Sequence, residues 1–401
     1  MSRPADPFTP SLNIAQLKES ATIAASARAR ALKAAGRTII DLGIGEPDFA
    51  TPVSIRAAAA AAVEAGATKY TATEGILPLR EAIAREAAGR WKGPLPISAT
   101  DVVVSGGSKQ SLFNACFSLF GPGDEVLIPT PSWTSYYEIV GLTRATAVSV
   151  MGDPADGYRV NAATLAAHAT ERTRGLMLNS PCNPTGAVYS AAALREILAL
   201  AADRGWWVIS DEIYRHIAYD APATTAFDVA TDRDRLIIVD GVAKSYAMTG
   251  WRIGWTVSAP AVAKAMTALQ SHTTSNPAAV SQHAALAALN GGEAVMAEVR
   301  AMVSAFHARR DAALRILQQE PAIQIIPPDG AFYLYFRAPG DAPDAGTRFA
   351  DRLLEQHGIA IVTGAAFGTP QWVRASYATA QPLVEKAMRA IVAAWRDGAV
   401  S

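Results

Sequence analysis

The stretch RGLMLNSPCNPTGAVYSAAALREILALAADRGWWVISDE, residues 174–212, joins two apolar runs through a segment with helical periodicity. The flanking runs, 174–181 and 206–212, have the length and composition of buried strands. Four apolar residues between them follow the i, i+3, i+4, i+7 spacing of one helix face: Leu194, Ile197, Leu198 and Ala201. Ser190 can cap the start of this helix, and Gly205 can end it. The stretch therefore predicts a strand, a crossover helix and a second strand of a parallel sheet.

The same pattern repeats from about residue 100 onward, where short β-branched runs alternate with helical patterns. Three further runs belong to it: DVVVSGG (101–107), DEVLIPTP (124–131) and LIIVDG (236–241). Such alternation is typical of an α/β fold, in which helices cover a mostly parallel sheet. We predict a large domain of this kind over residues 48–290.

The two ends of the chain show a different pattern. Residues 22–36, TIAASARARALKAAG, have the composition of a basic, alanine-rich helix that stops at its last glycine. A long helix is expected around 293–318, and the PPDG sequence at 327–330 predicts a hairpin before further α+β material. We therefore predict an N-terminal arm with part of the small domain over 1–47, and a smaller α+β domain over 291–401.

The composition excludes several classes of protein. The 401 residues include 36 basic and 36 acidic side chains, so no basic excess points to nucleic acid or to an anionic membrane. Cys116 and Cys182 do not make a disulfide framework, which favours a reduced, cytoplasmic protein. The first ten residues lack the apolar core of a secretory signal, and the longest uncharged run, 265–292, is too polar to span a membrane. We assign no metal ligand.

In open α/β sheets, ligands bind beyond the carboxyl ends of the strands. Each of the five predicted strands is followed by polar or glycine-containing sequence, in the segments 105–109, 129–133, 179–186, 210–214 and 239–255. Because the carboxyl ends of parallel strands meet at one edge of a sheet, we expect these five segments to converge on one site.

The last of these segments, VDGVAKSYAMTGWRIGW, carries only three charges, on Asp240, Lys244 and Arg252. Its tryptophans, methionine and glycines indicate a packed, partly buried turn, although both cations could also be ordinary exposed residues. Burial would lower the pKa of Lys244 and make its amine a nucleophile and a candidate Schiff-base former. Arg252 is suited to a phosphate or carboxylate, so the pair indicates a phosphorylated aldehyde.

The other four segments carry candidate ligands, each with an ordinary structural alternative. The turn at 106–110 offers backbone amides to a phosphate at a helix N-terminus, or it is only a tight turn. Asp211 could pair with a protonated pyridine nitrogen or cap a helix, and Tyr214 could contact the same ligand or belong to the core. Asn183 could present its amide inward or only shape a turn, and Trp133 could stack on a flat ring or only pack. All the ordinary alternatives would have to coincide at the tips of one sheet, which favours the site.

In their order and separations, NSPCNPTG, SDEIY and AKSYAMTGWRIG resemble the motifs of the fold-type I pyridoxal-phosphate aminotransferases of class I and II. The resemblance covers nearly the whole chain and includes four further segments: 41–48, 69–75, 330–333 and 373–377. It implies an α/β fold-type I large domain with a smaller α+β domain, and pyridoxal 5′-phosphate as the cofactor.

The resemblance also implies roles for the residues that contact the cofactor ring. Lys244 would bind the cofactor covalently and then shuttle the proton of the reaction. Asp211 would pair with the pyridinium nitrogen, while Tyr214 and Asn183 would hydrogen-bond the 3′ oxygen. Trp133 would stack on the ring. Lys244, Asp211 and Tyr214 are thus the expected catalytic residues.

The phosphate and the substrate have their own expected ligands. Arg252 would hold the phosphate together with the turn that contains Gly107, Ser108 and Lys109. Tyr70 resembles a tyrosine that the neighbouring subunit contributes to the phosphate, which implies a homodimer with shared active sites. Arg374 is similar to the arginine that clamps the substrate α-carboxylate, and Gly43 would assist through its backbone. Trp133, Asn183 and Lys109 would complete the substrate site.

Two positions differ from the pattern of that family. Many relatives have a phosphate-binding serine three residues before the lysine, whereas this chain has Gly241, which removes one possible hydrogen bond. Thr363 stands where proline is common, and we attach no function to that difference.

Substrate choice depends on how a second carboxylate is bound. One aspartate aminotransferase branch uses a distal arginine, but residues 265–290 contain none. A second branch uses a lysine in the phosphate turn and a Ser-Ala-Thr segment from the partner subunit, which this chain matches with Lys109 and residues 20–22. That branch handles aspartate with 2-oxoglutarate and, in some members, prephenate. Glu19 replaces its usual proline, and Lys109 could instead serve only the phosphate turn or solvent.

We therefore predict ping-pong transamination between an L-amino acid, aspartate or glutamate, and a 2-oxo acid such as 2-oxoglutarate. Aromatic amino acids or prephenate are alternative substrates, and a C–S lyase is an alternative reaction on the same fold. A DNA-binding regulator is disfavoured because the chain is not basic and begins too close to the enzyme domain for a helix-turn-helix. The N-terminal segment is expected to act as a lid or a dimer arm.

Overall fold

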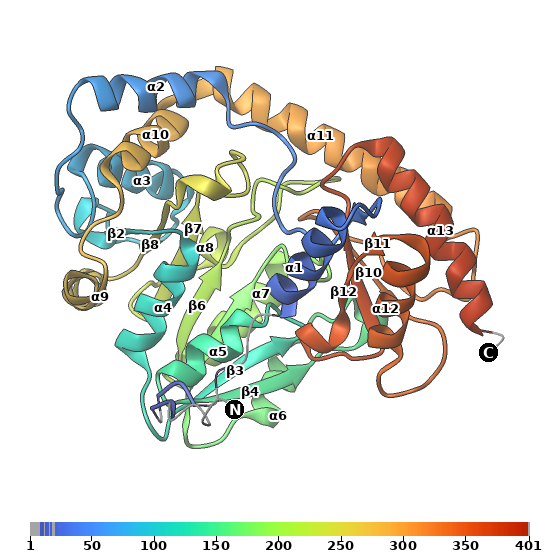
Figure 1. Ribbon diagram of the computed structural model, residues 1–401. Coiled ribbons are helices and arrows are strands. Elements are labelled where there is room, and N and C mark those ends of the chain that lie inside the picture. Colours follow the sequence, from blue (N-terminus) through green and yellow to red (C-terminus); the bar gives the residue numbers. More distant parts are fainter. Residues whose placement is uncertain (1–8, 12, 16, 18–20, 400–401) are drawn as a thin grey trace, which may run out of the picture.

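The computed structural model describes residues 9–11, 13–15, 17 and 21–399 (Figure 1). Its centre is a seven-stranded sheet with the strand order β2-β8-β7-β6-β5-β3-β4. The strands are β2 (Val102–Ser105), β3 (Glu125–Thr130), β4 (Thr146–Met151), β5 (Thr173–Asn179), β6 (Trp207–Asp211), β7 (Leu236–Gly241) and β8 (Gly254–Val257). All five strands predicted from the sequence are present and run in the same direction, because only β8 is antiparallel to its neighbours.

Two strands of this sheet were missed in the sequence. The edge strand β4 lies beyond β3 and exposes part of its surface, so it lacks the apolar run that marked the others. The strand β8 occupies the end of the lysine-containing segment, where it pairs Gly254 with Gly241 of β7. Because the chain reverses between β7 and β8, Lys244 and Arg252 lie on one connection at the carboxyl end of β7.

Helices cover both faces of the sheet. They are α2 (Val53–Glu64), α3 (Leu77–Arg90), α4 (Ser108–Leu119), α5 (Ser135–Leu142), α6 (Ala162–His168), α7 (Ala191–Asp203), α8 (Ala226–Val229), α9 (Pro260–Thr273) and α10 (Ala279–Asn290). The predicted crossover helix is α7, in which Ser190 caps the first turn by accepting a 3.2 Å hydrogen bond from the amide of Ala193. The glycine predicted to end it, Gly205, has a φ of 67°.

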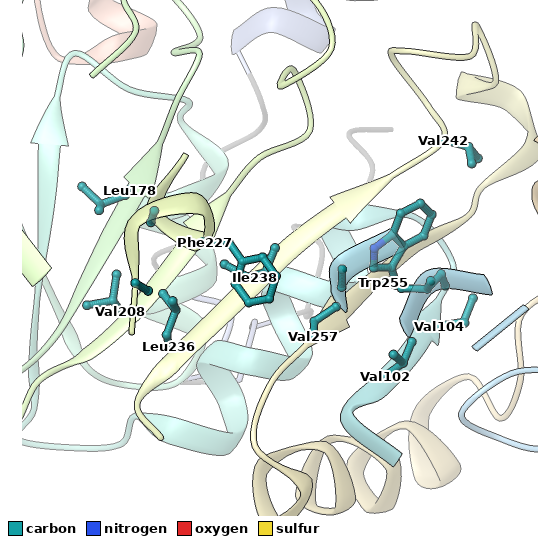
Figure 2. Packing of buried hydrophobic residues seen from close by; sticks show 14 of the residues in the cluster. Val102, Val104, Leu178, Val208, Phe227, Leu236, Ile238, Val242, Trp255 and Val257 are labelled. Atoms are coloured by element: carbon teal, nitrogen blue, oxygen red, sulfur yellow. The ribbon is translucent and has the colours of Figure 1, made fainter. Parts of the chain in front are cut away.

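Alternate residues of each strand enter two different cores, as the two-residue period of a strand requires. On β7, Leu236 and Ile238 pack with α2, α3, α7, α8 and α10, in the cluster that Figure 2 shows from close by. Ile237 and Val239 point to the opposite face and pack with α4, α5 and α9. Each fully buried side chain of this size stabilises the fold by roughly 1.5–3 kcal/mol, so the sheet is a rigid base for the residues at its edge.

The C-terminal part contains a second, four-stranded antiparallel sheet with the order β12-β13-β10-β9. Its elements are α11 (Gly292–Leu317), β9 (Ile325–Ile326), β10 (Tyr333–Arg337), α12 (Ala345–His357), β11 (Ile359–Ala360), β12 (Val362–Thr363), β13 (Trp372–Ser376) and α13 (Gln381–Ala399). The predicted long helix is α11, and the predicted hairpin joins β9 to β10. The α/β fold with an additional α+β part is therefore confirmed, while the boundaries at residues 47/48 and 290/291 stay predictions.

The N-terminal helix α1 (Ala21–Ala34) belongs spatially to this C-terminal part. The strand β1 (Ile40–Asp41), which follows α1, pairs in parallel with β11. Figure 1 shows α1 beside β12 and α12, between them and the seven-stranded sheet. Among the residues described, no helix is both long and apolar enough to cross a membrane.

Candidate active site

The carboxyl ends of the strands open into a cavity of about 460 Å³. All five segments that were expected to converge line it, and the convergence predicted from the strand ends is therefore correct. The loop after β1, strand β13 and helix α1 contribute further walls. The site thus lies where the seven-stranded sheet meets the C-terminal part of the chain.

Lys244 follows β7 and extends into this cavity. Its Nζ donates a hydrogen bond to the carbonyl oxygen of Gly45 and lies 5.8 Å from the ring centroids of Tyr214 and Phe332. Burial, with a smaller effect from the positive charge of Arg374, lowers the pKa of Lys244 to about 8. A substantial fraction of this amine is therefore neutral near pH 7.5, as a nucleophile or a base requires.

Asp211 ends β6, and its side chain is 2% exposed. Its Oδ1 accepts a 3.1 Å bond from the amide of Ile213, and its Oδ2 accepts a 2.8 Å bond from the hydroxyl of Tyr136. Burial raises the pKa of Asp211 to about 6, while these two hydrogen bonds oppose the increase. The alternative interpretation of Asp211 as a helix cap is wrong, because the next helix, α8, begins only at Ala226.

Arg374 on β13 is 2% exposed and held from two sides. Its Nη1 donates a 2.9 Å bond to Oδ1 of Asn183, and its Nη2 donates a 2.8 Å bond to the carbonyl of Gly43. The guanidinium lies 4.3 Å from the ring centroid of Tyr333 and 5.1 Å from that of Phe367. Burial lowers the pKa of Arg374, and its Nε has no hydrogen-bond partner among the described residues. The donor capacity that remains suits an anionic ligand.

A second anion-binding region lies at the N-terminus of α4. Gly107 precedes this helix with a φ of 97°, and a Cβ there would lie 2.4 Å from Nη2 of Arg252. Arg252 itself donates bonds of 3.0 Å and 3.3 Å to the carbonyls of Thr249 and Gly106. The close approach of this arginine brings a fixed positive charge to the N-terminus of α4, and a helix N-terminus is a favourable place for a phosphate.

The glycine that replaces the usual serine has a structural reason in this chain. A Cβ on Gly241 would lie 2.7 Å from Oγ of Ser108 and 2.9 Å from both Cα of Gly254 and the carbonyl oxygen of Ile253. Ser108 donates a 3.0 Å bond to the carbonyl of Asp240. The position therefore has no space for a serine side chain in this arrangement.

Lys109 and Trp133 form one wall of the cavity. The Nζ of Lys109 lies 4.7 Å from the centroid of the Trp133 ring. Burial, together with the nearby charge of Arg252, lowers the pKa of Lys109. The ammonium group thus lies over an aromatic face inside the cavity, which is compatible with contact to an anionic substrate group.

One predicted residue, Tyr70, lies outside the cavity of this chain, and the predicted Ser-Ala-Thr segment at 20–22 is only partly described. Tyr70 is 92% exposed and does not line the cavity. Glu19 and Ser20 lie outside the described residues, as does the side chain of Thr22. The hydroxyl of Tyr214, by contrast, lies in the site, 2.9 Å from that of Tyr333.

Sequence reasoning assigned no role to several residues that line the site: Ser26, Arg30, Tyr136, Asn179 and Tyr333. Tyr136 lies three residues after Trp133, as the second residue of α5, and this spacing was the only available signal. Tyr333 was part of a recognised motif, GAFY, without an assigned contact. Ser26 and Arg30 lie in α1, a helix that was predicted from the sequence without any indication of the elements it packs against.

The fold and the site, a parallel sheet with a lysine, a carboxylate and two arginines at one edge, are those of a fold-type I aminotransferase. The chain belongs to the aminotransferase class I and II family, whose model matches residues 37–391. It is therefore an enzyme that transfers an amino group between an amino acid and a 2-oxo acid. The resemblance stated from the motifs is confirmed.

Several relatives match this chain over nearly its whole length. The aspartate aminotransferase of Streptomyces avermitilis is 41% identical, and the match covers 94% of this chain and 95% of that protein. The aspartate/prephenate aminotransferase of Cereibacter sphaeroides is also 41% identical, with 95% and 97% covered. The structure of the Thermus thermophilus aspartate aminotransferase with maleate superposes with a TM-score of 0.92 at 37% identity, covering 96% of this chain and 100% of that one.

Proposed function

We propose that this chain is a pyridoxal 5′-phosphate-dependent aminotransferase that exchanges the amino group of aspartate or glutamate with a 2-oxo acid such as 2-oxoglutarate, by a ping-pong mechanism. The observation that carries the proposal is the position of Lys244, whose pKa is lowered to about 8 in the cavity that also contains Asp211 and Arg374. A neutral amine, a buried carboxylate and an anchored guanidinium are the three groups that this chemistry needs.

The residues of the cavity fit this cofactor. The N-terminus of α4, with Ser108 and Arg252, would hold the phosphate. Asp211 is buried with a pKa of about 6, and a cationic ring nitrogen is the partner that would keep it ionised. Tyr214 and Asn183 would bond the 3′ oxygen, and Trp133 would stack on the ring. When bound, the cofactor supplies an aldehyde for the amino group and a ring that withdraws electrons.

The protein groups then position the substrate and move its proton. Arg374 would bind the α-carboxylate, with Asn183 and Gly43 keeping the guanidinium in place. Nζ of Lys244 would take the proton from the substrate Cα, which requires the neutral amine that its lowered pKa provides. Closure of the C-terminal part over the cavity would exclude water during this proton transfer.

Lys109 supports a dicarboxylic substrate, since it presents an ammonium group inside the cavity. The names of the relatives agree with this choice, and the Thermus thermophilus structure contains maleate, a four-carbon dicarboxylate. We further propose a homodimer in which Tyr70 reaches the phosphate of the neighbouring subunit, because its 92% exposure makes it available for such a contact. A cytoplasmic location stays a prediction.

The test is a half-reaction of the purified holoenzyme with single amino acids in the absence of any oxo acid. Aspartate and glutamate should bleach the absorbance of the bound aldehyde form rapidly. Bleaching only by phenylalanine or alanine would support transamination but reject a dicarboxylic amino acid as the substrate. Release of pyruvate and ammonia from cysteine without an oxo acid would favour the C–S lyase. The Lys244→Ala variant should show no half-reaction, and retained activity would reject the central assignment.

A further inference from the structure

One face of α1 forms part of the cavity wall. Ile23, Ser26 and Arg30 all line the cavity, and their i, i+3, i+7 spacing places them on one side of the helix. These residues come from a segment far from the strand tips in sequence. Helix α1 therefore contributes an arginine, Arg30, to the cavity wall. The proposed function gives this arginine no role.

The opposite face of α1 fastens the helix to the C-terminal part. Ala29 is fully buried and packs with Leu354 of α12 and Ala360 of β11. Arg28 donates bonds of 2.5 Å to Asp351 and 2.7 Å to Glu355, both on α12. Because Ala29 and Arg28 face α12, Arg30 lies on another side of the helix, and it lines the cavity.

Arg30 has no hydrogen bond or ion pair within the part of the chain that the structure describes. The other arginines of the cavity are held by protein groups, Arg374 by Asn183 and Arg252 by backbone carbonyls. An arginine that lines a cavity with its donors free is available to a ligand, and its planar fork matches a carboxylate.

The charges of the cavity indicate which ligand this is. Among the described residues, five cationic side chains line it: Arg30, Lys109, Lys244, Arg252 and Arg374. Under the proposed function, Arg252 serves the phosphate, Arg374 serves the α-carboxylate, and the Lys244 nitrogen carries out the chemistry. The acidic residues of the wall are also engaged, since Glu46 accepts a 2.9 Å bond from Thr249 and Asp211 accepts two bonds. Lys109 and Arg30 remain for a further anionic group of the substrate.

We propose that Arg30 is a second ligand of the distal carboxylate of the dicarboxylic substrate and acts together with Lys109. The inference rests on the proposed function and adds a specificity-determining residue to it. Lys109 lies on the Trp133 side of the cavity, and Arg30 comes from α1, which is fastened to the C-terminal part. The distal carboxylate would thus contact both the part of the chain that contains the seven-stranded sheet and the C-terminal part. Substrate binding would therefore favour closure of these two parts over the cavity.

The experiment uses the holoenzyme and its variants Arg30→Gln, Arg30→Lys and Arg28→Gln. Half-reaction kcat/KM values are measured with aspartate, glutamate and alanine, and the dissociation constant of maleate is obtained from the change in cofactor absorbance. We expect Arg30→Gln to lose about 10- to 100-fold with aspartate, glutamate and maleate, but less than about twofold with alanine, which lacks the distal carboxylate. Arg30→Lys should recover part of the loss, because the charge remains without the fork.

Arg28→Gln is the matched control, because it removes a charge from the same helix on the side that faces α12. Because these ion pairs are partly exposed and Arg30 stays in place, Arg28→Gln should change the ratio of aspartate to alanine by less than about twofold. An Arg30→Gln enzyme that keeps the wild-type ratio of aspartate to alanine would overturn the inference while the proposed function stands. A wild-type enzyme that does not react with dicarboxylic amino acids would reject the proposed substrate and the inference together.

Discussion

The hydroxyl of Tyr136 donates a 2.8 Å hydrogen bond to Oδ2 of Asp211, the carboxylate that ends β6. With the amide of Ile213 on Oδ1, each carboxylate oxygen has a donor, so the plane of the group is held in one orientation. Burial and the adjacent Asp211 raise the pKa of Tyr136. The phenol therefore stays protonated and acts as the hydrogen-bond donor to the carboxylate. Tyr136 thus positions a carboxylate whose ionisation burial opposes.

Replacement of Tyr136 by Phe should weaken the binding of pyridoxal phosphate. The lost hydrogen bond lowered the pKa of Asp211, so that pKa should rise above about 6 and less carboxylate should be ionised at pH 7. A bond to a charged group contributes about 1.5–3 kcal/mol, which corresponds to roughly a tenfold or greater loss of cofactor affinity. Because the higher pKa moves the ionisation of Asp211 into this range, the dissociation constant of the cofactor should fall more steeply between pH 6 and pH 8 than in the wild type.

The neighbouring Tyr137 provides a matched control. Its hydroxyl bonds Thr130 and Ser132 and not the carboxylate. Tyr137→Phe should leave the pH dependence of cofactor binding as it is. Equal pH profiles for Tyr136→Phe and the wild type would contradict the positioning role.

Replacement of Arg374 by Lys should reduce kcat/KM for every amino acid by about 100-fold or more, because a point charge cannot reproduce two parallel hydrogen bonds to a carboxylate. The loss should be similar for aspartate and alanine, since both carry the α-carboxylate. Steady-state kinetics with the two donors measure it. Arg337 on the adjacent strand β10, which pairs with the exposed Asp341, is the control, and Arg337→Lys should stay within about twofold. A loss restricted to aspartate would assign Arg374 to the distal carboxylate instead.

Introducing the serine that many relatives carry, by Gly241→Ser, should destabilise this protein and not improve phosphate binding. The new Cβ would meet Ser108 at 2.7 Å and backbone atoms at 2.9 Å, and such overpacking costs about 1–3 kcal/mol. Thermal unfolding of the apoprotein and the cofactor dissociation constant report the two effects. Gly250→Ser is a suitable control, because a Cβ at Gly250 has no atom within 4 Å. Tighter cofactor binding by Gly241→Ser would show that the connection has more freedom than we infer.

The uptake of pyridoxal phosphate by the apoprotein should depend on the protonation of Lys244. Only the neutral amine reacts, and the neutral fraction falls about tenfold for each pH unit below the pKa. With a pKa of about 8, the rate should rise from pH 6 to pH 8 and then level off. Stopped-flow absorbance across this range measures it. A rate that continues to rise toward the ordinary lysine value of 10.5 would show that burial does not lower this pKa.

The strands and the chemistry at their ends could be predicted from the sequence because both depend on local pattern. A buried parallel strand is a short apolar run, and its carboxyl end must lie at the shared edge, so Lys244 and Asp211 could be brought together without coordinates. The edge strand β4 and the reversed strand β8 were missed for the same reason, since neither has that pattern.

Contacts between distant segments could be decided only by the tertiary structure. Arg374 bonds Asn183 and Gly43, which lie 191 and 331 positions away in the chain, and Tyr136 bonds Asp211 across 75 positions. Arg30 reaches the cavity because α1 packs on α12, and no periodicity within α1 identifies that partner. The sequence by itself determined five strands of the sheet, the convergence of their carboxyl ends and the position of Lys244 after one of them. Which side chains hold those groups in place depended on side-chain packing between segments, a property that local pattern does not contain.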